Sequence, residues 1–396
     1  MRKVWLVALA ALLTLGMALA HGQDGHDHSP KDHGHGEGVF RRLAVADAKE
    51  PLVRILDEEG KELARFTVPS PASLYPLPGG QYVLGVHREA GAVGFLFGGF
   101  RLEDHGDHMD VKRETPYVAA TLRTGPKPTH VFAKGNWLAV FHDGDGTVAL
   151  FDLRRLGLDW TPRLVATGGA DHGAVALLGE ALLVGGLETG RVEVYTLAGT
   201  RVHTLPEACP RLHGEAVLGE VAAFGCADGV LLVELRGRGF LGRKVPNPPG
   251  SPQGARVGTL TAHPKHPFFV GNFGQGLAFI DPKAGRLEAM ALPASPLGFA
   301  FDPEGEALWV LTADGRFHRL DPMARRVVAS LEVVSPWAQG APRPRLALGH
   351  GVAYLTDPAR GEVVKVNLEE GKVEARLAVG GSPSAIALFE VKGMEH

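Results

Sequence analysis

The chain has 396 residues, of which 45% are hydrophobic and 21% are charged, and its formal net charge is -3. This balance supplies enough apolar material for a large core, and the mildly acidic charge argues against general nucleic-acid binding. With only 2 cysteines, the chain cannot build a disulfide scaffold or a zinc cluster held by thiolates. Its unusual feature is its content of 18 histidines.

The amino terminus has the features of a signal peptide. Arg2 and Lys3 form a basic start, residues 4–18 are almost wholly apolar, and Ala18-Leu19-Ala20 fits the small-x-small cleavage rule. The apolar run is shorter than the about 20 residues that cross a bilayer, and no cysteine follows it directly to carry a lipid. We therefore expect residues 1–20 to be removed, the protein to be periplasmic, and no stable membrane insertion.

A polar, histidine-rich tail follows the expected cleavage site. Residues 21–38 hold no apolar side chain that could be buried, and their histidines are His21, His26, His28, His33 and His35. Such a segment cannot offset its ordering entropy, so we expect it to be disordered. A flexible tail can bring two or more imidazoles onto one metal ion. We predict a metal-binding tail of modest affinity; the alternative is a solvated tail without a ligand.

From residue 40 onward, short β-rich segments alternate with turns rich in Gly, Pro and Asp. Segments expected to begin an innermost strand recur at about the 40–50-residue period of propeller blades. They start near Ser73, Thr129, Asp171, Leu212, Thr259, Leu297, Arg345 and Ser384. Strands in residues 40–46, 52–56 and 63–68 would join the last strand, 384–391, in a blade that closes the ring. We predict an all-β propeller domain over residues 39–396 with eight four-stranded blades, or seven if one unit is misassigned.

Three histidines occupy the same position in three successive predicted blades. His130, His172 and His213 each fall where the innermost strand begins, so their side chains should point at the channel from one end. Three converging imidazoles match the protein ligands of an open zinc site. Asp171 and Glu215 stand beside them as further ligands or as groups that orient a ring. The alternative is three unrelated polar residues that bind water.

A second group of possible ligands lengthens the first predicted internal blade. In residues 103–110, His105 and His108 are interspersed with acidic residues that include Asp104 and Asp107, and this nitrogen and oxygen set suits zinc. The segment should join the third and fourth strands of its blade, on the face opposite the three channel histidines. It could form a separate site or fold inward, or it could be a solvated acidic loop.

The two cysteines, Cys209 and Cys226, map to the face that carries the three channel histidines. An oxidising compartment would allow them to pair; the alternative is two separate buried thiols. Residues 143–146 on that face read Asp-Gly-Asp-Gly and resemble a fragment of a calcium loop, but the closing ligands are missing, so we interpret them as a turn. His87 and His142 end second strands there and are either outer ligands or without a role.

Several motifs occur in a fixed order along the chain. They are E-D-H-G-D-H (103–108), P-T-H-V (128–131), D-G-D-G (143–146), D-H-G (171–173), L-H-G-E (212–215) and F-G-C-x-D-G (224–229), after a signal peptide and a His/Asp-rich tail. This order resembles the AztD family of periplasmic zinc metallochaperones over nearly the whole mature chain. The resemblance implies a propeller that binds Zn²⁺ and passes it to the solute-binding protein of a zinc ABC importer. It also carries ligand roles to His105, His108, His130, His172 and His213.

These observations lead to a non-enzymatic function of capture, storage and hand-over of zinc by a monomeric protein. No G-x-S-x-G elbow, H-E-x-x-H helix, Walker loop or dinucleotide fingerprint stands in a suitable context. Two alternatives stay open, a metal-dependent propeller hydrolase or lactonase, and a docking scaffold whose tail buffers metal. Copper is an alternative metal, because a chain that starts at His21 offers an amine and an imidazole and copper binds such ligands more tightly than zinc.

Overall fold

Aspartate turns end many of the apolar strands in the computed structural model, which describes residues 37–395. Asp281 and Asp321 each accept hydrogen bonds from two backbone N–H groups of the following turn, at 2.8 to 3.0 Å. Such a contact stabilises a turn instead of a longer strand. The predicted signal peptide and the tail histidines His21, His26, His28, His33 and His35 lie outside the described residues.

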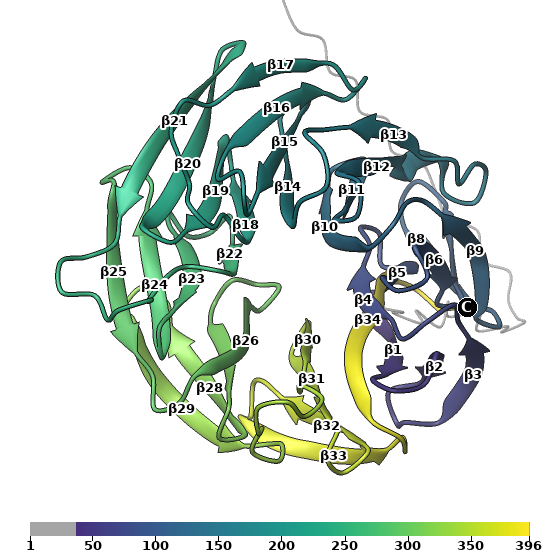
Figure 1. Cartoon of the computed structure of the whole chain (residues 1–396). Coiled ribbons are helices and arrows are strands. Elements are labelled where there is room, and N and C mark those ends of the chain that lie inside the picture. The colour runs from purple at the N-terminus through teal and green to yellow at the C-terminus, as the bar shows by residue number, and fades with distance from the viewer. Residues whose placement is uncertain (1–36, 396) are drawn as a thin grey trace, which may run out of the picture. The chain divides into compact units, whose positions relative to one another are not determined.

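Eight four-stranded antiparallel sheets and one two-stranded hairpin make up the fold. The sheets stand around a central channel as the blades of a propeller (Figure 1). The predicted all-β class and the count of eight blades are confirmed, and every innermost strand begins within three residues of its predicted start. None of the helices in residues 37–395 is long and apolar enough to span a membrane.

In each blade, the first-named strand lines the channel and the fourth lies at the rim. The composite blade contains β34 (Pro383–Gly393), β1 (Gly38–Asp47), β2 (Leu52–Leu56) and β3 (Glu62–Thr67). The next three blades contain β4 (Ser73–Pro76), β5 (Tyr82–His87), β6 (Ala92–Phe97) and β9 (Tyr117–Arg123); β10 (Pro128–Lys134), β11 (Trp137–His142), β12 (Thr147–Asp152) and β13 (Arg163–Ala166); and β14 (Gly173–Leu178), β15 (Ala181–Gly186), β16 (Val192–Thr196) and β17 (Arg201–Thr204).

The remaining four blades follow in the same order. They contain β18 (Glu215–Leu218), β19 (Val221–Cys226), β20 (Gly229–Arg236) and β21 (Gly239–Pro246); β22 (Leu260–Ala262), β23 (Phe269–Phe273), β24 (Gly276–Asp281) and β25 (Arg286–Ala291); β26 (Pro296–Phe301), β27 (Leu308–Thr312), β28 (Arg316–Asp321) and β29 (Arg326–Glu332); and β30 (Leu346–Gly349), β31 (Val352–Asp357), β32 (Glu362–Asn367) and β33 (Lys372–Ala378). Outside the blades lie the hairpin strands β7 (Phe100–Asp104) and β8 (Met109–Arg113) and the short 3-10 helix η1 (Leu153–Arg155).

The two ends of the described chain meet in the composite blade, as predicted. Strand β1 pairs antiparallel with β34 along a register that runs from Gly38 opposite Gly393 to Asp47 opposite Pro383, with one irregularity. The side chains of Leu43 and Val45 in β1 are fully buried. Burial of each such side chain contributes about 1.5–3 kcal/mol, so this pairing both closes the ring and stabilises it.

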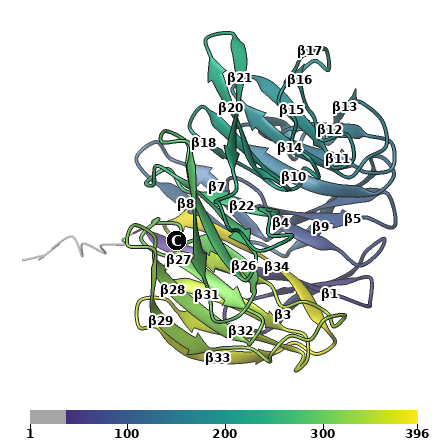
Figure 2. The same ribbon diagram turned by 60° about the vertical axis from the view of Figure 1, so that its left-hand side comes forward.

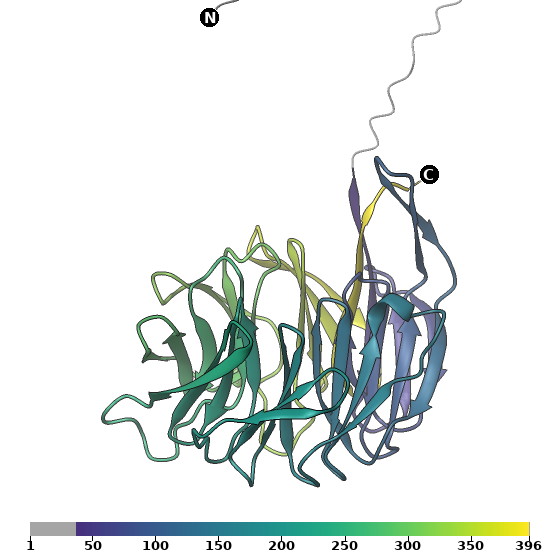
Figure 3. The same ribbon diagram turned by 90° about the horizontal axis from the view of Figure 1, so that it is seen from above.

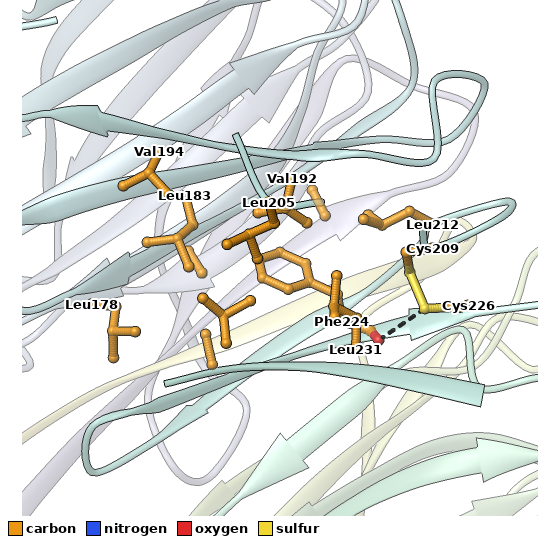
Figure 4. Close-up of a cluster of buried hydrophobic side chains, with 14 of the residues drawn as sticks. Leu178, Leu183, Val192, Val194, Leu205, Cys209, Leu212, Phe224, Cys226 and Leu231 are labelled. Carbon is orange, nitrogen blue, oxygen red and sulfur yellow. Dashed lines mark hydrogen bonds between the residues drawn. A yellow bond between two sulfur atoms is a disulfide. The ribbon is translucent and has the colours of Figure 1, made fainter. Parts of the chain in front are cut away.

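The apolar core lies between the blades instead of within one central volume. Each of eight clusters of buried side chains joins two neighbouring blades, and together they account for every junction of the ring. Figure 4 shows the cluster between the β14–β17 and β18–β21 blades, where Leu183 and Val194 face Phe224 and Leu231. The position of one blade therefore fixes the position of the next.

The two faces of the propeller differ. The innermost strands begin on the face that we call the histidine face, because His130, His172 and His213 lie at those beginnings. The hairpin β7–β8 is inserted between β6 and β9, where a third strand ends, and so lies on the opposite face, which we call the hairpin face. Asp110 of the hairpin bridges Met394 at the end of β34, and the hairpin and the C-terminal end lie together in two further views (Figure 2, Figure 3).

Candidate metal centre

Three imidazole rings meet at the histidine face. His130 lies in β10, while His172 and His213 lie in the loops directly before β14 and β18. The three pairs of ring centroids are 4.9, 5.2 and 5.0 Å apart, and one ring nitrogen from each residue lies within 4.8 Å of the others. Nε2 of His130 is 3.2 Å from Nε2 of His172. Two nitrogens on a tetrahedral zinc ion are about 3.3 Å apart, so this pair already has the spacing of zinc ligands.

Two of the rings are oriented by oxygen atoms that can only accept a hydrogen bond. Nδ1 of His172 donates to Oδ2 of Asp143 at 2.8 Å, and Nδ1 of His213 donates to the carbonyl oxygen of Gly258 at 2.6 Å. Because the proton of each neutral ring is then on Nδ1, the lone pair is on Nε2. These contacts leave both Nε2 atoms in the form that binds a metal.

The third ring, His130, faces a buried carboxylate. Its Nδ1 lies 3.7 Å from Oε2 of Glu215. Burial lowers the pKa of His130, but the hydrogen-bonding and charge interactions with Glu215, aided by the charge of Asp143, outweigh it and raise the pKa overall. Glu215 therefore supports the charged form of His130 across 3.7 Å, whereas Asp143 is hydrogen-bonded directly to His172.

The pKa of His213 moves in the opposite direction. Burial lowers it, the hydrogen bond to Gly258 partly opposes this effect, and repulsion from His130 and His172 lowers it further. A ring that resists protonation keeps its lone pair available at neutral pH. The cluster thus combines a ring that readily carries charge with one that stays neutral.

The carboxylates around the cluster supply negative charge that hydrogen bonds do not fully satisfy. Oδ1 of Asp143 and Oε2 of Glu215 are buried and have no hydrogen-bond partner within residues 37–395. Leaving such an atom without a partner costs free energy, and a cation bound by the adjacent rings would offset that cost. Three imidazoles, once neutral, with two nearby carboxylates therefore suit a divalent cation.

The hairpin brings together a second, smaller set of polar groups. Nε2 of His105 lies 3.2 Å from Oδ2 of Asp110, and Nε2 of His108 lies 3.2 Å from Oδ1 of the same carboxylate. The two rings stack with centroids 5.2 Å apart. The turn between them is held by the His105 N–H, which donates to the carbonyl oxygen of His108 at 3.0 Å. Two imidazoles and one carboxylate thus converge on one region of the hairpin face.

Asp104 and Asp107, the acidic residues named from the sequence, make hydrogen bonds within the hairpin turn. Asp104 accepts a hydrogen bond from the Gly106 N–H at 2.7 Å, and Asp107 accepts one from Nδ1 of His108 at 2.7 Å. Asp110, the third aspartate of the predicted ligand segment, lies at the centre of the group. The hairpin is on the face opposite the channel histidines, as expected, and does not fold inward.

No family model matches the sequence. The chain is 26% identical over 370 residues to the zinc chaperone AztD of Citrobacter koseri, a match that covers 90% of this chain and 88% of the relative. The structure of apo AztD from Citrobacter koseri superposes with a TM-score of 0.81 at 25% identity, over 91% of this chain and 100% of that one. The resemblance to AztD is confirmed.

A second crystal structure of Citrobacter koseri AztD gives the same TM-score, 0.81, at 26% identity. More distant similarity extends to the dihydro-heme d1 dehydrogenase NirN, with a TM-score of 0.60 at 14% identity over 87% of this chain and 74% of that one. This last similarity concerns the propeller fold alone. AztD therefore differs from the other propeller in matching both the fold and the sequence.

Sequence reasoning misjudged two aspartates near the cluster. Asp171 precedes His172 directly, but its carboxylate accepts hydrogen bonds from the N–H groups of Glu188 and Thr189 at 3.2 to 3.3 Å. Asp143, interpreted only as part of a turn, is the residue that binds His172. The sequence did offer a reason to consider Asp143 as a partner of these histidines, because its loop was predicted to lie on the histidine face.

His87 and His142 are hydrogen-bonded inside their own blades. Nδ1 of His87 binds the carbonyl oxygen of Ser70 at 2.9 Å, while His142 binds the carbonyl oxygen of Thr147 at 3.0 Å and the hydroxyl of Thr124 at 2.8 Å. Both side chains are buried. Of the two interpretations left open for them, the contacts favour a structural role.

A disulfide joins Cys209 and Cys226, as expected for paired thiols on the histidine face. It holds the loop that carries His213 against the end of β19 (Figure 4). The same loop is also held by the His213 N–H, which donates to the carbonyl oxygen of Gly225 at 3.0 Å. The disulfide thus contributes to the placement of one ring of the cluster.

Proposed function

We propose that the protein is a periplasmic zinc metallochaperone that holds Zn²⁺ at His130, His172 and His213. The observation that carries this proposal is the convergence of three rings, two of which have their Nδ1 proton fixed by an acceptor. The similarity to AztD, which is named a zinc chaperone, supports the same metal.

The chemistry of the site accounts for tight but reversible binding. Three neutral imidazoles occupy three of the four positions that zinc prefers and leave one for water or for an incoming ligand. The carboxylate of Asp143 orients the ring of His172, and the carboxylates of Asp143 and Glu215 would balance the charge of the ion. Because imidazole binding needs the neutral ring, the affinity should fall when the cluster is protonated.

Release would use the open fourth position. A partner that offers its own ligand at the histidine face can bind the ion before all three histidines have let go. The exchange then proceeds in steps, and none of them requires free zinc. The partner we propose is the periplasmic solute-binding protein of a zinc ABC importer, and the chaperone acts as a monomer.

The hairpin and the tail would collect zinc with lower affinity. His105, His108 and Asp110 lie on the hairpin face, and Gly38, where the tail joins the propeller, pairs with Gly393 on that same face. The ligands of the tail, residues 21–38, are tethered to the propeller by the chain, and tethered weak sites raise the local concentration of the ion near the channel cluster.

The first test separates the propeller site from the tail. Zinc affinity is measured for a form that lacks residues 21–36, for the same form with His172→Ala, and for a matched control with His203→Ala, an exposed histidine on β17. We expect the truncated form and the His203→Ala control to bind zinc tightly, and the His172→Ala variant to lose this tight binding. Absence of tight zinc from the truncated protein would instead favour the docking scaffold with a metal-buffering tail.

The second test addresses hand-over. Zinc-loaded protein is mixed with the apo solute-binding protein and a competing chelator, and the rate of transfer is compared with the rate of loss to the chelator. Transfer no faster than loss would rule out direct exchange. The same preparation is assayed against lactone and ester substrates, because turnover that disappears with His172→Ala would support the hydrolase alternative. Competition with copper tests the metal, since copper binds imidazoles more strongly.

A further inference from the structure

A cavity of about 480 Å³ opens at the histidine face between the inner strands β4 and β34 and the loop that leads to β30. Part of its wall is apolar and is formed by Leu74, Val86 and Ile386. The rest carries three guanidinium groups, which belong to Arg88, Arg343 and Arg345. A cavity with apolar walls and several fixed cations is suited to an organic anion.

Arg343 has a donor without an acceptor. Its Nη2 donates to the carbonyl oxygens of Leu297 at 2.5 Å and of Pro296 at 3.3 Å, whereas its Nε is buried and has no hydrogen-bond partner in residues 37–395. Burial lowers the pKa of Arg343, and repulsion from Arg345 lowers it further. An anion in the cavity beside Arg343 and Arg345 would reduce the repulsion between the two guanidinium groups.

The carboxylate in the cavity wall does not neutralise the arginines. Asp47 accepts hydrogen bonds from the backbone N–H groups of Lys49, Glu50 and Ser382, at 2.8, 3.1 and 2.7 Å. Its oxygens are thereby committed to the backbone. Arg88 is paired with Asp143, so the excess of positive charge in the wall comes from Arg343 and Arg345.

The cavity is connected to the metal cluster through one arginine. Nη1 of Arg88 donates to Oδ2 of Asp143 at 2.8 Å, and that same oxygen accepts the hydrogen bond from Nδ1 of His172 at 2.8 Å. Arg88 and Asp143 follow the last residues of β5 and β11, the second strands of adjacent blades. A change at Arg88 therefore reaches a proposed zinc ligand through a single carboxylate.

We propose that this cavity is a binding site for a carboxylate on a short aliphatic chain, supplied by an Asp or Glu side chain of the protein that accepts the metal. The guanidinium groups bind the carboxylate, and the apolar wall contacts the methylene groups. Inorganic phosphate offers nothing to that wall. The carboxylate site itself does not depend on zinc, whereas its coupling to the cluster rests on the function proposed above.

The coupling has a defined sign. Zinc on His172 draws electron density from Asp143 through the ring, so Asp143 becomes a weaker acceptor for Arg88. Arg88 is then freer to bind the incoming carboxylate, and by linkage the carboxylate also strengthens zinc binding. The acceptor protein would therefore dock preferentially on the zinc-loaded chaperone.

Carboxylate binding is measured first on the zinc-free protein by calorimetric titration at constant ionic strength. The probes are butyrate, inorganic phosphate, and a short peptide with one Glu compared with the same peptide carrying Gln. We expect butyrate and the Glu peptide to bind and phosphate and the Gln peptide not to bind. Phosphate binding as tight as butyrate would overturn the assignment to carboxylates, and binding of butyrate without the Glu peptide would overturn the assignment to a protein side chain.

Variants locate the site. Arg345→Gln changes an exposed side chain and should weaken binding by about tenfold or more, as loss of a charge-assisted hydrogen bond does. Arg343→Gln should act similarly, while Arg326→Gln on the outer strand β29 is the control and should have no effect. If Arg345→Gln binds the carboxylate with the same affinity as the wild type, the carboxylate does not bind in this cavity and the proposal is overturned.

A final titration compares zinc-loaded with zinc-free protein, and tighter carboxylate binding to the loaded form is expected. If zinc itself does not bind, the proposed chaperone function fails while the carboxylate site stands on the first two experiments. If zinc binds but does not change carboxylate affinity, only the coupling through Arg88 is overturned. The two proposals therefore fail in distinguishable ways.

Discussion

Asp143 and His172 come from loops of neighbouring blades, and the carboxylate of one accepts a hydrogen bond from Nδ1 of the other at 2.8 Å. The contact crosses a blade junction. It places the proton of the ring away from the cluster, so the orientation of one metal-binding side chain is set by the blade beside it.

Asp143→Asn should therefore weaken zinc binding while leaving the fold intact. The amide keeps the size of the side chain but removes its charge, and loss of a group that orients a metal-binding histidine typically costs about 10–100-fold in affinity. The measurement is a zinc competition titration at pH 7. Asp145→Asn, in the same turn but exposed, is the matched control, and an equal loss in both variants would assign the effect to the turn.

Stability should fall as the pH decreases from 7 to 5. Burial lowers the pKa of His87, His142 and His318, so the unfolded chain takes up protons that the folded chain resists. The stabilising contribution is complete above the unfolded value of about 6.5 and is lost as the pH falls through it, by up to about 1.4 kcal/mol per pH unit for each group.

Urea unfolding of the zinc-free protein at several pH values measures this slope. His318→Gln removes one of the groups and should reduce the slope, whereas His203→Ala should not change it. A free energy of unfolding that stays constant between pH 7 and pH 5 would contradict the expectation.

Removal of the disulfide should lower both stability and zinc affinity. Cys209 and Cys226 are 17 residues apart, and closing a loop of that size contributes about 3 kcal/mol in the chain-entropy account. Cys209→Ala with Cys226→Ala should lower the unfolding midpoint, and zinc should bind more weakly because the loop before His213 is less constrained. Zinc affinity equal to that of the oxidised wild type would show that the backbone contacts of the loop suffice.

Substitution of both hairpin histidines should remove a weak site and spare the tight one. In a form that lacks residues 21–36, His105→Ala with His108→Ala should reduce the number of weakly bound zinc ions and leave the affinity of the channel cluster unchanged. Equilibrium dialysis over a range of zinc concentrations measures both quantities. If the double substitution instead abolishes tight zinc binding, the hairpin and not the channel cluster is the principal zinc site.

Loss of β34 should prevent folding. A chain that ends before residue 383 lacks the innermost strand of the composite blade, leaves Leu43 and Val45 without the partners they pack against, and reopens the ring. Circular dichroism and limited proteolysis should show an unfolded or aggregated product. Deletion of residues 21–36 is the control and should leave the propeller folded.

The number and boundaries of the blades were predictable because the turns between their strands are determined by nearby residues. Asp281 and Asp321 end strands through contacts with the next few residues, and such contacts do not depend on the rest of the fold. The three channel histidines followed from the same repeat, because equivalent positions in a propeller share one end of the channel.

The partners of those histidines were harder to predict. The carboxylate of Asp171 is bound by the backbone N–H groups of Glu188 and Thr189, whereas Glu215, two residues after His213, lies 3.7 Å from the ring of His130. Asp143 contacts His172 across a junction between two blades. The local sequence of one blade does not predict how that blade packs against its neighbour, so this contact could not be predicted. The pairing of His105 and His108 with Asp110 likewise depends on the hairpin that their segment forms.

The pairing of Gly38 with Gly393 has a practical consequence for how the molecule can be attached to something else. Both ends of the propeller leave it on the hairpin face, beside Met394 and Asp110. A linker, a label or a solid support joined at either end would therefore leave the opposite face unobstructed. A protein immobilised through its C-terminus should present His130, His172 and His213 to the solution in a single orientation.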